Sequence, residues 1–148
     1  LLIEWSVWSN TIDGHYDDNI PNHAKNLMFK LTVLKQGRDI CMGIITPELQ
    51  KVLNDTFGGR RAFDFLLENT TDIENSPNLP ISFENLPEHL QSLIRLAIWK
   101  SFQRPHVYFV IENDTLRQKV TELLKKVKIP INIINSEEAL KIVDECIA

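Results

Sequence analysis

The chain has 148 residues, 43% of them hydrophobic, so it can bury one core, and we expect a single domain spanning 1–148. Its formal net charge of −4 excludes a broad basic face, so any contact with nucleic acid must be local. No apolar run approaches the roughly 18 residues of a membrane span, and no signal-peptide pattern opens the chain. Cys41 and Cys146 lie far apart among apolar residues, as reduced core thiols do. We expect a soluble, cytoplasmic protein without a membrane partner.

The first quarter of the chain predicts a strand, a loop and a helix. An apolar start ends in Glu4, where the first strand should emerge from the sheet. The segment Thr11–Asn22 is rich in Asp, Asn and Gly and predicts a mobile loop. Apolar residues then recur at helical spacing from Ala24 to Leu34, and Gly37 provides a stop.

The next segment predicts a second strand followed by two helices. Asp39–Ile45 has the composition of a strand, and Thr46 can cap a helix in which Pro47 takes the first position. Gly58–Gly59 interrupts the helical spacing, so a second, short helix should follow. The stretch Asn69–Asn78 is polar and rich in turn-forming residues, and no strand is expected there.

The rest of the chain repeats this alternation. Further strands are predicted at Leu79–Phe83, Val107–Ile111 and Ile129–Ile134, and further helices after Pro87, after Asn113 or Asp114, and after Ser136 as a cap. Val107–Ile111 is nearly all apolar, which is typical of a strand covered on both faces. Pro130 indicates a strand start or a sheet edge. The class that follows is an α/β three-layer α/β/α sandwich around a mainly parallel sheet of about five strands.

Acids and amides stand where two of these strands end. Ligands of open α/β sheets bind outside the carboxyl ends of the strands, which is where Glu4, Glu112, Asn113 and Asp114 are expected. Each also has a structural interpretation, because Asn113 or Asp114 is a good helix cap and a lone Glu near a strand end is usually solvated. The common nucleotide, serine hydrolase and zinc motifs are absent from the sequence.

Five blocks of the sequence resemble the PIN-domain family. The blocks are Leu2–Trp8, which resembles the family's first strand; Ile44–Leu53, similar to I-S-P-x-L-x-x-E-L; Leu86–Glu88, similar to the block before a helix; Val110–Leu116, similar to V-T-x-D-x-x-L; and Ile129–Leu140, similar to the terminal strand and helix start. Their order covers nearly the whole chain. The resemblance implies hydrolysis of RNA by clustered acids that hold Mg²⁺ or Mn²⁺ and position a water molecule.

The resemblance also assigns residues to this site. The implied metal ligands are Glu4, Glu48, Glu88, Asn113 and Asp114, and the implied catalytic acids are Glu4, Glu88 and Asp114. The sequence departs from the pattern at Val52, where the family has Glu, and at Asn113, where it has Asp. Glu48 and Glu88 each follow a proline in a first helical turn, so the helix dipole explains them equally well. The four histidines lack ligand spacing and are expected on the surface.

Two functional hypotheses remain open. One is a metal-dependent ribonuclease acting on single-stranded RNA, for example the toxin of a toxin–antitoxin pair. The other is a non-catalytic PIN-like module that binds an antitoxin, another protein or RNA, and a homo-oligomer stays open for both. The segments Arg60–Arg61 and Lys100–Arg104, the second with Phe102 interleaved, fit either phosphate contacts or solvated surface. Trp5 and Trp8 are expected in the core or at a dimer contact.

Overall fold

The computed structural model describes residues 1–12, 22–36, 43–79, 83, 85–104 and 106–147. The elements in chain order are β1 (Leu2–Ile3), α1 (Trp5–Ile12), α2 (His23–Gln36), β2 (Gly43–Ile45), α3 (Pro47–Phe57), α4 (Arg61–Thr70), β3 (Thr71–Ile73), α5 (Glu88–Ser101), β4 (Tyr108–Val110), α6 (Asp114–Lys126), β5 (Asn132–Ile134) and α7 (Ser136–Ile147). The predicted loop Thr11–Asn22 is wrong at its start, because Thr11 and Ile12 end helix α1, which the sequence pattern did not predict. Residues 13–21, Cys41 and the side chain of Cys146 lie outside the described part of the chain, and so do the predictions made for them.

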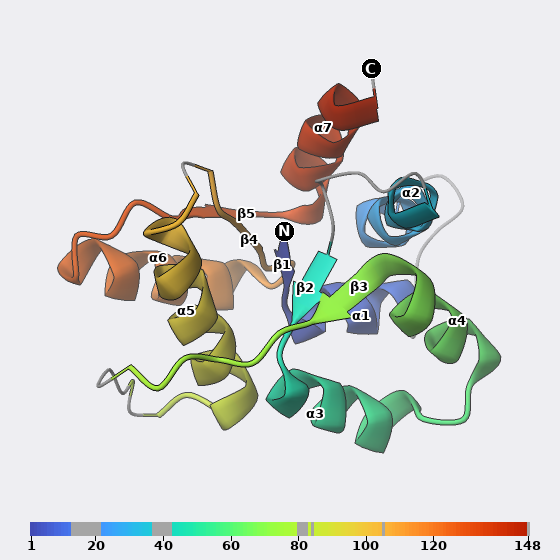
Figure 1. The fold of residues 1–148 in the computed structure, drawn as a ribbon, viewed down its shortest axis with the longest axis horizontal. Coiled ribbons are helices and arrows are strands. Elements are labelled where there is room, and N and C mark those ends of the chain that lie inside the picture. Colours follow the sequence, from blue (N-terminus) through green and yellow to red (C-terminus); the bar gives the residue numbers. More distant parts are fainter. Residues whose placement is uncertain (13–21, 37–42, 80–82, 84, 105, 148) are drawn as a thin grey trace.

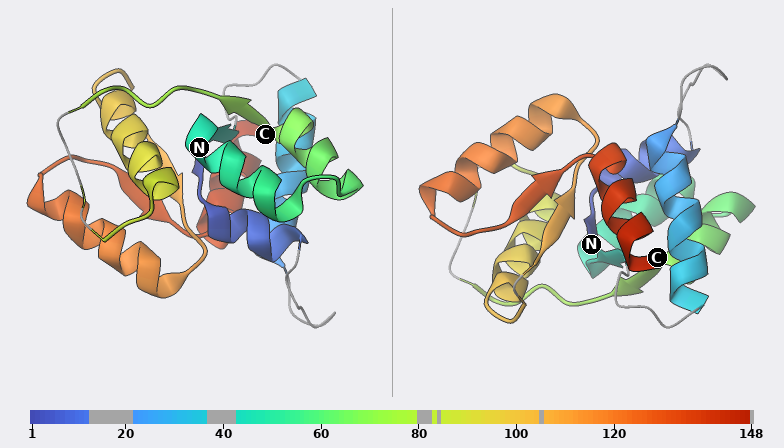
Figure 2. Two further views of the ribbon diagram at one scale, coloured as in Figure 1. Left: turned by 90° about the horizontal axis from the view of Figure 1, so that it is seen from below. Right: turned by 90° about the horizontal axis from the view of Figure 1, so that it is seen from above.

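One parallel sheet of five strands forms the middle layer, in the order β3-β2-β1-β4-β5. Helices α2 and α7 lie side by side on one face, and α5 and α6 cover the other (Figures 1 and 2). The predicted three-layer α/β/α sandwich is therefore confirmed. The chain runs outward from β1 to β3 and then returns to the other side of β1 as β4, so the strand order reverses between β1 and β4. In open α/β folds this reversal marks the usual ligand position.

The core fills both faces of the central strands. Phe109 and Val110 of β4 are fully buried, as the nearly all-apolar pattern of Val107–Ile111 predicts. An aromatic cluster ties three helices together, with the rings of Trp8 and Phe63 5.9 Å apart and those of Phe63 and Phe57 also 5.9 Å apart. Trp8 therefore belongs to the core, as one of its two interpretations expects.

The third strand is not where the sequence pattern places it. β3 (Thr71–Ile73) lies inside the stretch predicted as turns, whereas Leu79 and Phe83 belong to no strand and 80–82 lie outside the described residues. Gly43 of β2 explains part of the pairing, because a Cβ there would meet Thr70 O at 3.0 Å and the Thr71 methyl at 3.0 Å. The glycine lets β3 approach closely and bury Thr71, although Asp72 and Ile73 are exposed at an edge of the sheet.

Helix caps follow the predictions at two of three places. Thr46 caps α3 and accepts a hydrogen bond from Leu49 N, with Pro47 in the first turn. Asn113 caps α6. The predicted cap Ser136 is wrong, because Asn135 accepts from Glu138 N at 2.9 Å and donates its own N–H to the Glu138 carboxylate at 3.3 Å. This reciprocal capping box leaves Ser136 as the first residue of α7.

Candidate functional site

The carboxyl ends of β1 and β4 lie next to each other at the reversal of strand order. Ile3 of β1 pairs with Val110 of β4, and Glu4 N donates to Val110 O at 3.1 Å. Glu4 and Asn113 were expected at one edge of the sheet, after strands that are adjacent or one apart, and this is confirmed because the two strands are adjacent. The residues that emerge here are Glu4 and Ser6 after β1, and Glu112 and Asn113 after β4.

Glu4 is buried, with 3% of its surface exposed, and its carboxylate turns back onto α1. Its Oε2 accepts hydrogen bonds from Ser6 N at 2.8 Å and from the Ser6 hydroxyl. The first of these is the bond that an N-cap residue makes to the second residue of a helix. Burial raises the pKa of the Glu4 carboxyl above its ordinary value, and the hydrogen bonds from Ser6 oppose that rise. Glu4 thus closes the start of α1 from inside the protein.

Ser6 connects the two strand ends. While its hydroxyl donates to Glu4, the same oxygen accepts from Glu112 N at 2.9 Å and from Asn113 N at 3.3 Å. One side chain therefore satisfies two backbone donors just past β4 and holds the Glu4 carboxylate. Sequence reasoning did not single out Ser6, and the signal for it was a hydroxyl residue two positions after a strand-end acid.

Asn113 and Asp114 have local partners at the start of α6. The Asn113 side chain accepts from Leu116 N at 2.9 Å, so its structural interpretation as a helix cap is confirmed. The Asp114 side chain is 81% exposed and forms an ion pair with Arg117. Arg117 also donates to Ile111 O at 3.0 Å, which fixes the ion pair against the end of β4.

Glu88 and Glu48 begin two other helices. Glu88 opens α5, and its side chain is 63% exposed and paired with Arg95. Glu48 lies in the first turn of α3 and is half-buried. Its Oε2 is buried with no hydrogen-bond partner among the described residues, and the same is true of Glu112 Oε2. Glu112 was noted in the sequence only for its place after β4, and these unpartnered oxygens set it and Glu48 apart from the other acids.

The predicted ligands are not gathered into one group. Among the residues that the structure describes, no three His, Cys, Asp or Glu side chains lie close enough together to hold a metal ion. Glu4, Glu88 and Asp114, the three acids implied to be catalytic, instead hold Ser6, Arg95 and Arg117. The donor set as it stands does not fit a divalent cation held by all five predicted residues.

Comparisons of the chain with protein-family models, with curated proteins and with solved structures found no match. The resemblance to PIN domains therefore rests on the sequence blocks. In the described part of the chain, no helix combines the length and the apolar character needed to cross a membrane.

Proposed function

We propose that this protein is a PIN-like binding module that recognises a protein partner or RNA, and that its carboxyl-edge polar residues serve to hold the fold. The observation that carries the proposal is the bond network of Ser6, which engages the Glu4 carboxylate and two backbone N–H groups after β4. The apolar sequence around both cysteines supports placing the module in the cytoplasm.

The energetics of the network favour this proposal. A hard divalent cation needs carboxylate oxygens that can turn toward it. For Glu4 to do so, its Oε2 must leave the N–H that it caps, and losing a helix cap typically costs about 1 kcal/mol. The Ser6 hydroxyl also joins Glu4 to the backbone after β4, so turning the carboxylate away would disturb both strand ends. Glu4 therefore serves the fold better than it serves a ligand.

A metal-dependent ribonuclease of PIN-like type is the second candidate, and one observation favours it. Glu48 and Glu112 each keep a buried carboxylate oxygen without a partner among the described residues. Buried unpartnered groups are uncommon and often mark a place where an ion or water binds. Mg²⁺ commonly binds proteins through only one or two carboxylates together with substrate phosphates, so a smaller acid set than the predicted one would suffice.

Melting temperature with and without metal separates the two candidates. The wild type, Glu112→Gln and the surface control Glu122→Gln are each melted with Mg²⁺, with Mn²⁺ and with chelator, and each is incubated with labelled single-stranded RNA. If the protein is a binding module, each protein should melt at the same temperature with Mg²⁺, with Mn²⁺ and with chelator, and the RNA should stay intact. The ribonuclease predicts that metal stabilises the wild type, by about 2.7 kcal/mol when the metal is at 100 times its Kd. It also predicts cleavage that Glu112→Gln loses and Glu122→Gln keeps. Metal-dependent cleavage with that pattern would overturn the module.

A further inference from the structure

The opposite, amino edge of the sheet has a charge unlike that of the rest of the molecule. The turns before β4 and β5 lie there, and Asn132 N donates to Val107 O at 3.1 Å where the two turns meet the sheet. We call residues 99–104, 106–108 and 125–132 the basic edge. These 17 residues contain Lys100, Arg104, Lys125, Lys126 and Lys128 and no Asp or Glu. Because the whole chain has a net charge of −4, the other 131 residues carry −9.

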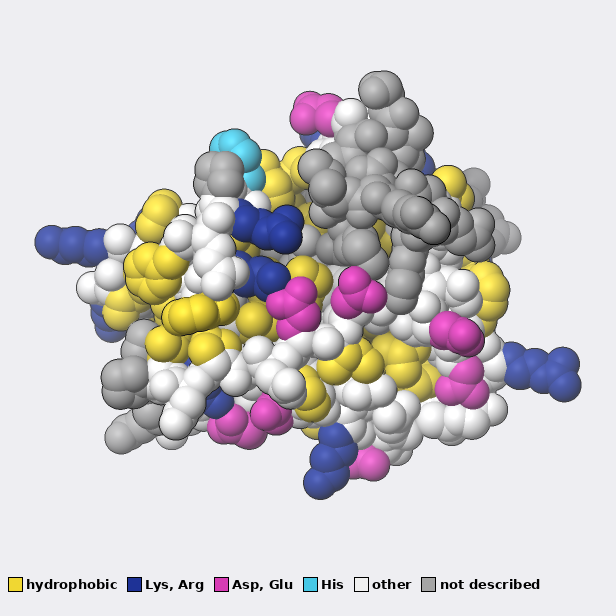
Figure 3. Space-filling model, in the orientation of Figure 1, with side chains coloured by type: hydrophobic (Ala, Val, Ile, Leu, Met, Phe, Trp, Pro, Cys, Tyr) yellow, Lys and Arg dark blue, Asp and Glu magenta, His cyan; other side chains and the backbone are white. Residues whose placement is uncertain are grey.

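Aromatic rings lie on the same edge. Phe102, just after α5, is 74% exposed, and Trp99 in the last turn of α5 is 44% exposed. The exposed ring of His106 stacks on Tyr108, with centroids 6.4 Å apart and planes 15° from parallel. Figure 3 shows Lys and Arg side chains beside hydrophobic ones over α5. Exposed aromatic rings and cations therefore lie on the same edge of the sheet, where Glu74 from another part of the chain pairs with Lys100.

Stability alone accounts for only part of this arrangement. Lys125 and Lys126 lie in the last turn of α6, where cations complement the helix dipole. Lys100 is largely buried and pairs with Glu74 at 2.7 Å. Neither effect explains a phenylalanine that is 74% exposed, nor the exposed Arg104 and Lys128 outside both helices. Charge and exposed aromatic surface are two separate observations that indicate the same ligand chemistry.

We propose that the basic edge is a binding surface for single-stranded RNA, remote from the carboxyl edge, with Phe102 and Trp99 stacking on bases and Arg104 and Lys128 contacting phosphates. The proposal rests on the binding-module function and names its partner. Unpaired bases offer faces to aromatic rings and phosphates offer charge to Lys and Arg, which is how strands are held without sequence preference. A duplex hides its base faces, and an acidic protein would not need stacked rings. Glu74 pairs with Lys100, so we assign the phosphate contacts to Arg104 and Lys128, and the negative net charge of the rest of the chain disfavours binding of the strand elsewhere.

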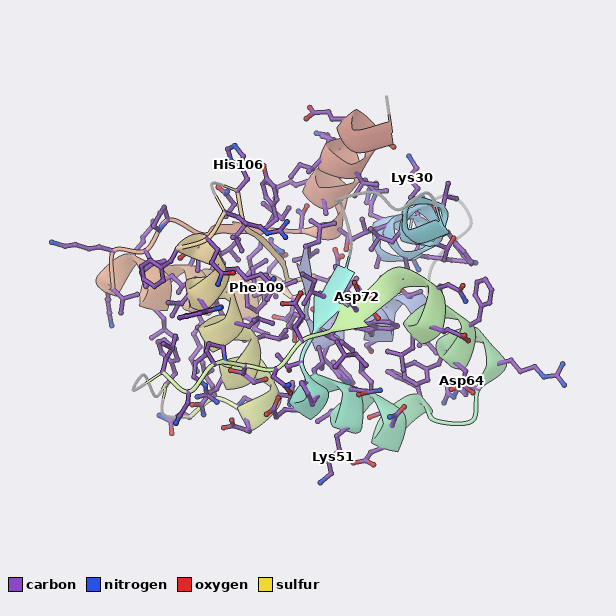
Figure 4. The ribbon with its side chains drawn as sticks, in the orientation of Figure 1. Lys30, Lys51, Asp64, Asp72, His106 and Phe109 are labelled. Atoms are coloured by element: carbon purple, nitrogen blue, oxygen red, sulfur yellow. The ribbon has the colours of Figure 1, made fainter. Side chains whose placement is uncertain are left out.

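Binding of a labelled RNA strand of about 12 nucleotides tests the surface. Fluorescence anisotropy compares the wild type with Phe102→Ala, with the double variant Arg104→Ala/Lys128→Ala, and with the control Lys51→Ala. Lys51 is an exposed lysine on α3, at the end of the molecule opposite His106 (Figure 4). Phe102→Ala should weaken binding by about tenfold because a base can no longer stack on the ring. The double variant should also flatten the plot of log affinity against log salt by about 0.7 for each phosphate that the protein no longer neutralises. Lys51→Ala should bind as the wild type does.

The possible outcomes distinguish failure of the basic-edge proposal from failure of the binding-module proposal. Duplex RNA of the same sequence and a polyglutamate peptide should bind much more weakly than the single strand, and equal binding of either overturns the stacking role. Wild-type binding that persists unchanged in Phe102→Ala and in the double variant overturns the surface and leaves an RNA-binding module. No binding of RNA by the wild type overturns the surface and leaves a module for a protein partner. Metal-dependent cleavage overturns the module, while the anisotropy series still decides whether the basic edge holds the strand.

Discussion

The two edges of the sheet use polar residues in opposite ways. At the carboxyl edge, Glu4, Ser6 and Asn113 form hydrogen bonds with the protein's own backbone and with one another. At the basic edge, Arg104 and Phe102 are exposed to solvent. The strand order points to the carboxyl edge as the ligand position, but the groups left available for a ligand lie mostly at the other end. The fold alone therefore indicates where a ligand usually binds, but the hydrogen bonds and ion pairs of each side chain decide whether that side chain is available for a ligand.

This difference should appear as a difference in stability. A buried polar group that loses its partner costs about 1–3 kcal/mol, whereas substitutions on an exposed surface usually change stability by less than about 0.5 kcal/mol. Substitutions that remove a hydrogen-bonding group at the carboxyl edge should therefore be costly, and substitutions at the basic edge should be nearly neutral for folding. Four predictions test that contrast.

Among substitutions of polar residues at the two edges, the largest effect is expected for Ser6→Ala. The change removes the acceptor of the Glu112 and Asn113 N–H groups and a donor to the buried Glu4 carboxylate, so it should lower the free energy of unfolding by about 2–3 kcal/mol. Urea denaturation measures it. The control is Ser76→Ala, whose hydroxyl makes, among the described residues, only a long bond of 3.4 Å to Pro77 O. Equal losses in the two variants would show that the network does not hold the strand ends.

Removing a buried helix cap should cost more stability than removing a cap at the surface. The Thr46 hydroxyl is buried, caps α3 and lies 2.7 Å from Ser92 Oγ, so Thr46→Ala should cost about 1.5–2 kcal/mol. Asn113 caps α6 at the surface, and Asn113→Ala should cost about 0.5–1 kcal/mol. Thermal and urea unfolding of the two variants gives the comparison. A larger loss at Asn113 than at Thr46 would contradict the role of burial.

Most of the fold follows from local patterns in the sequence. The apolar run Val107–Ile111 predicted β4, Thr46-Pro47 predicted the start of α3, and alternation predicted a parallel sheet. β3 was missed because Thr71–Ile73 is short and polar at a sheet edge, and its pairing depends on Gly43, a close approach that only the folded chain reveals. Ser136 was mistaken for a cap because the neighbouring Asn135 can serve equally well.

The candidate site was predictable in position but not in its bonds. The alternation of strands and helices places Glu4 and Asn113 past strand ends at one edge of the sheet, and the structure agrees and makes the two strands adjacent. The sequence pattern does not predict that Ser6 donates hydrogen bonds to the Glu4 carboxylate, because these bonds depend on where α1 begins. The partner of Asp114 lies three residues away on the same helix, so helical spacing could have suggested that pair, whereas the partner of Glu88 lies seven residues away, beyond the usual reach of such pairs.

A further effect, dependent on pH, is expected for Glu4→Gln. Because burial raises the folded pKa of Glu4 above 4.5, the protonated form fits the fold better, and the stability that it contributes is lost as pH rises through the folded pKa. Glu4→Gln mimics the protonated form, so it should match the wild type near pH 4 and be more stable at pH 7. The hydrogen bonds from Ser6 limit the gain. Urea unfolding from pH 4 to pH 7 measures the gain in stability. A variant less stable than the wild type at pH 7 would show that the hydrogen bonds from Ser6 stabilise the carboxylate more than burial destabilises it.

The smallest effect on stability is expected for Phe102→Ala at the basic edge. Its ring is 74% exposed, so removing it should change the free energy of unfolding by less than about 0.5 kcal/mol. The matched variant Phe109→Ala removes the same ring from the buried centre of β4 and should cost about 3–5 kcal/mol. Urea unfolding of both variants makes the comparison. A loss above about 1 kcal/mol at Phe102 would mean that the ring packs against the protein and belongs to the fold. A negligible loss would mean that the ring does not stabilise the fold. Any decrease in RNA affinity in the same variant would then report direct stacking of the ring on the strand.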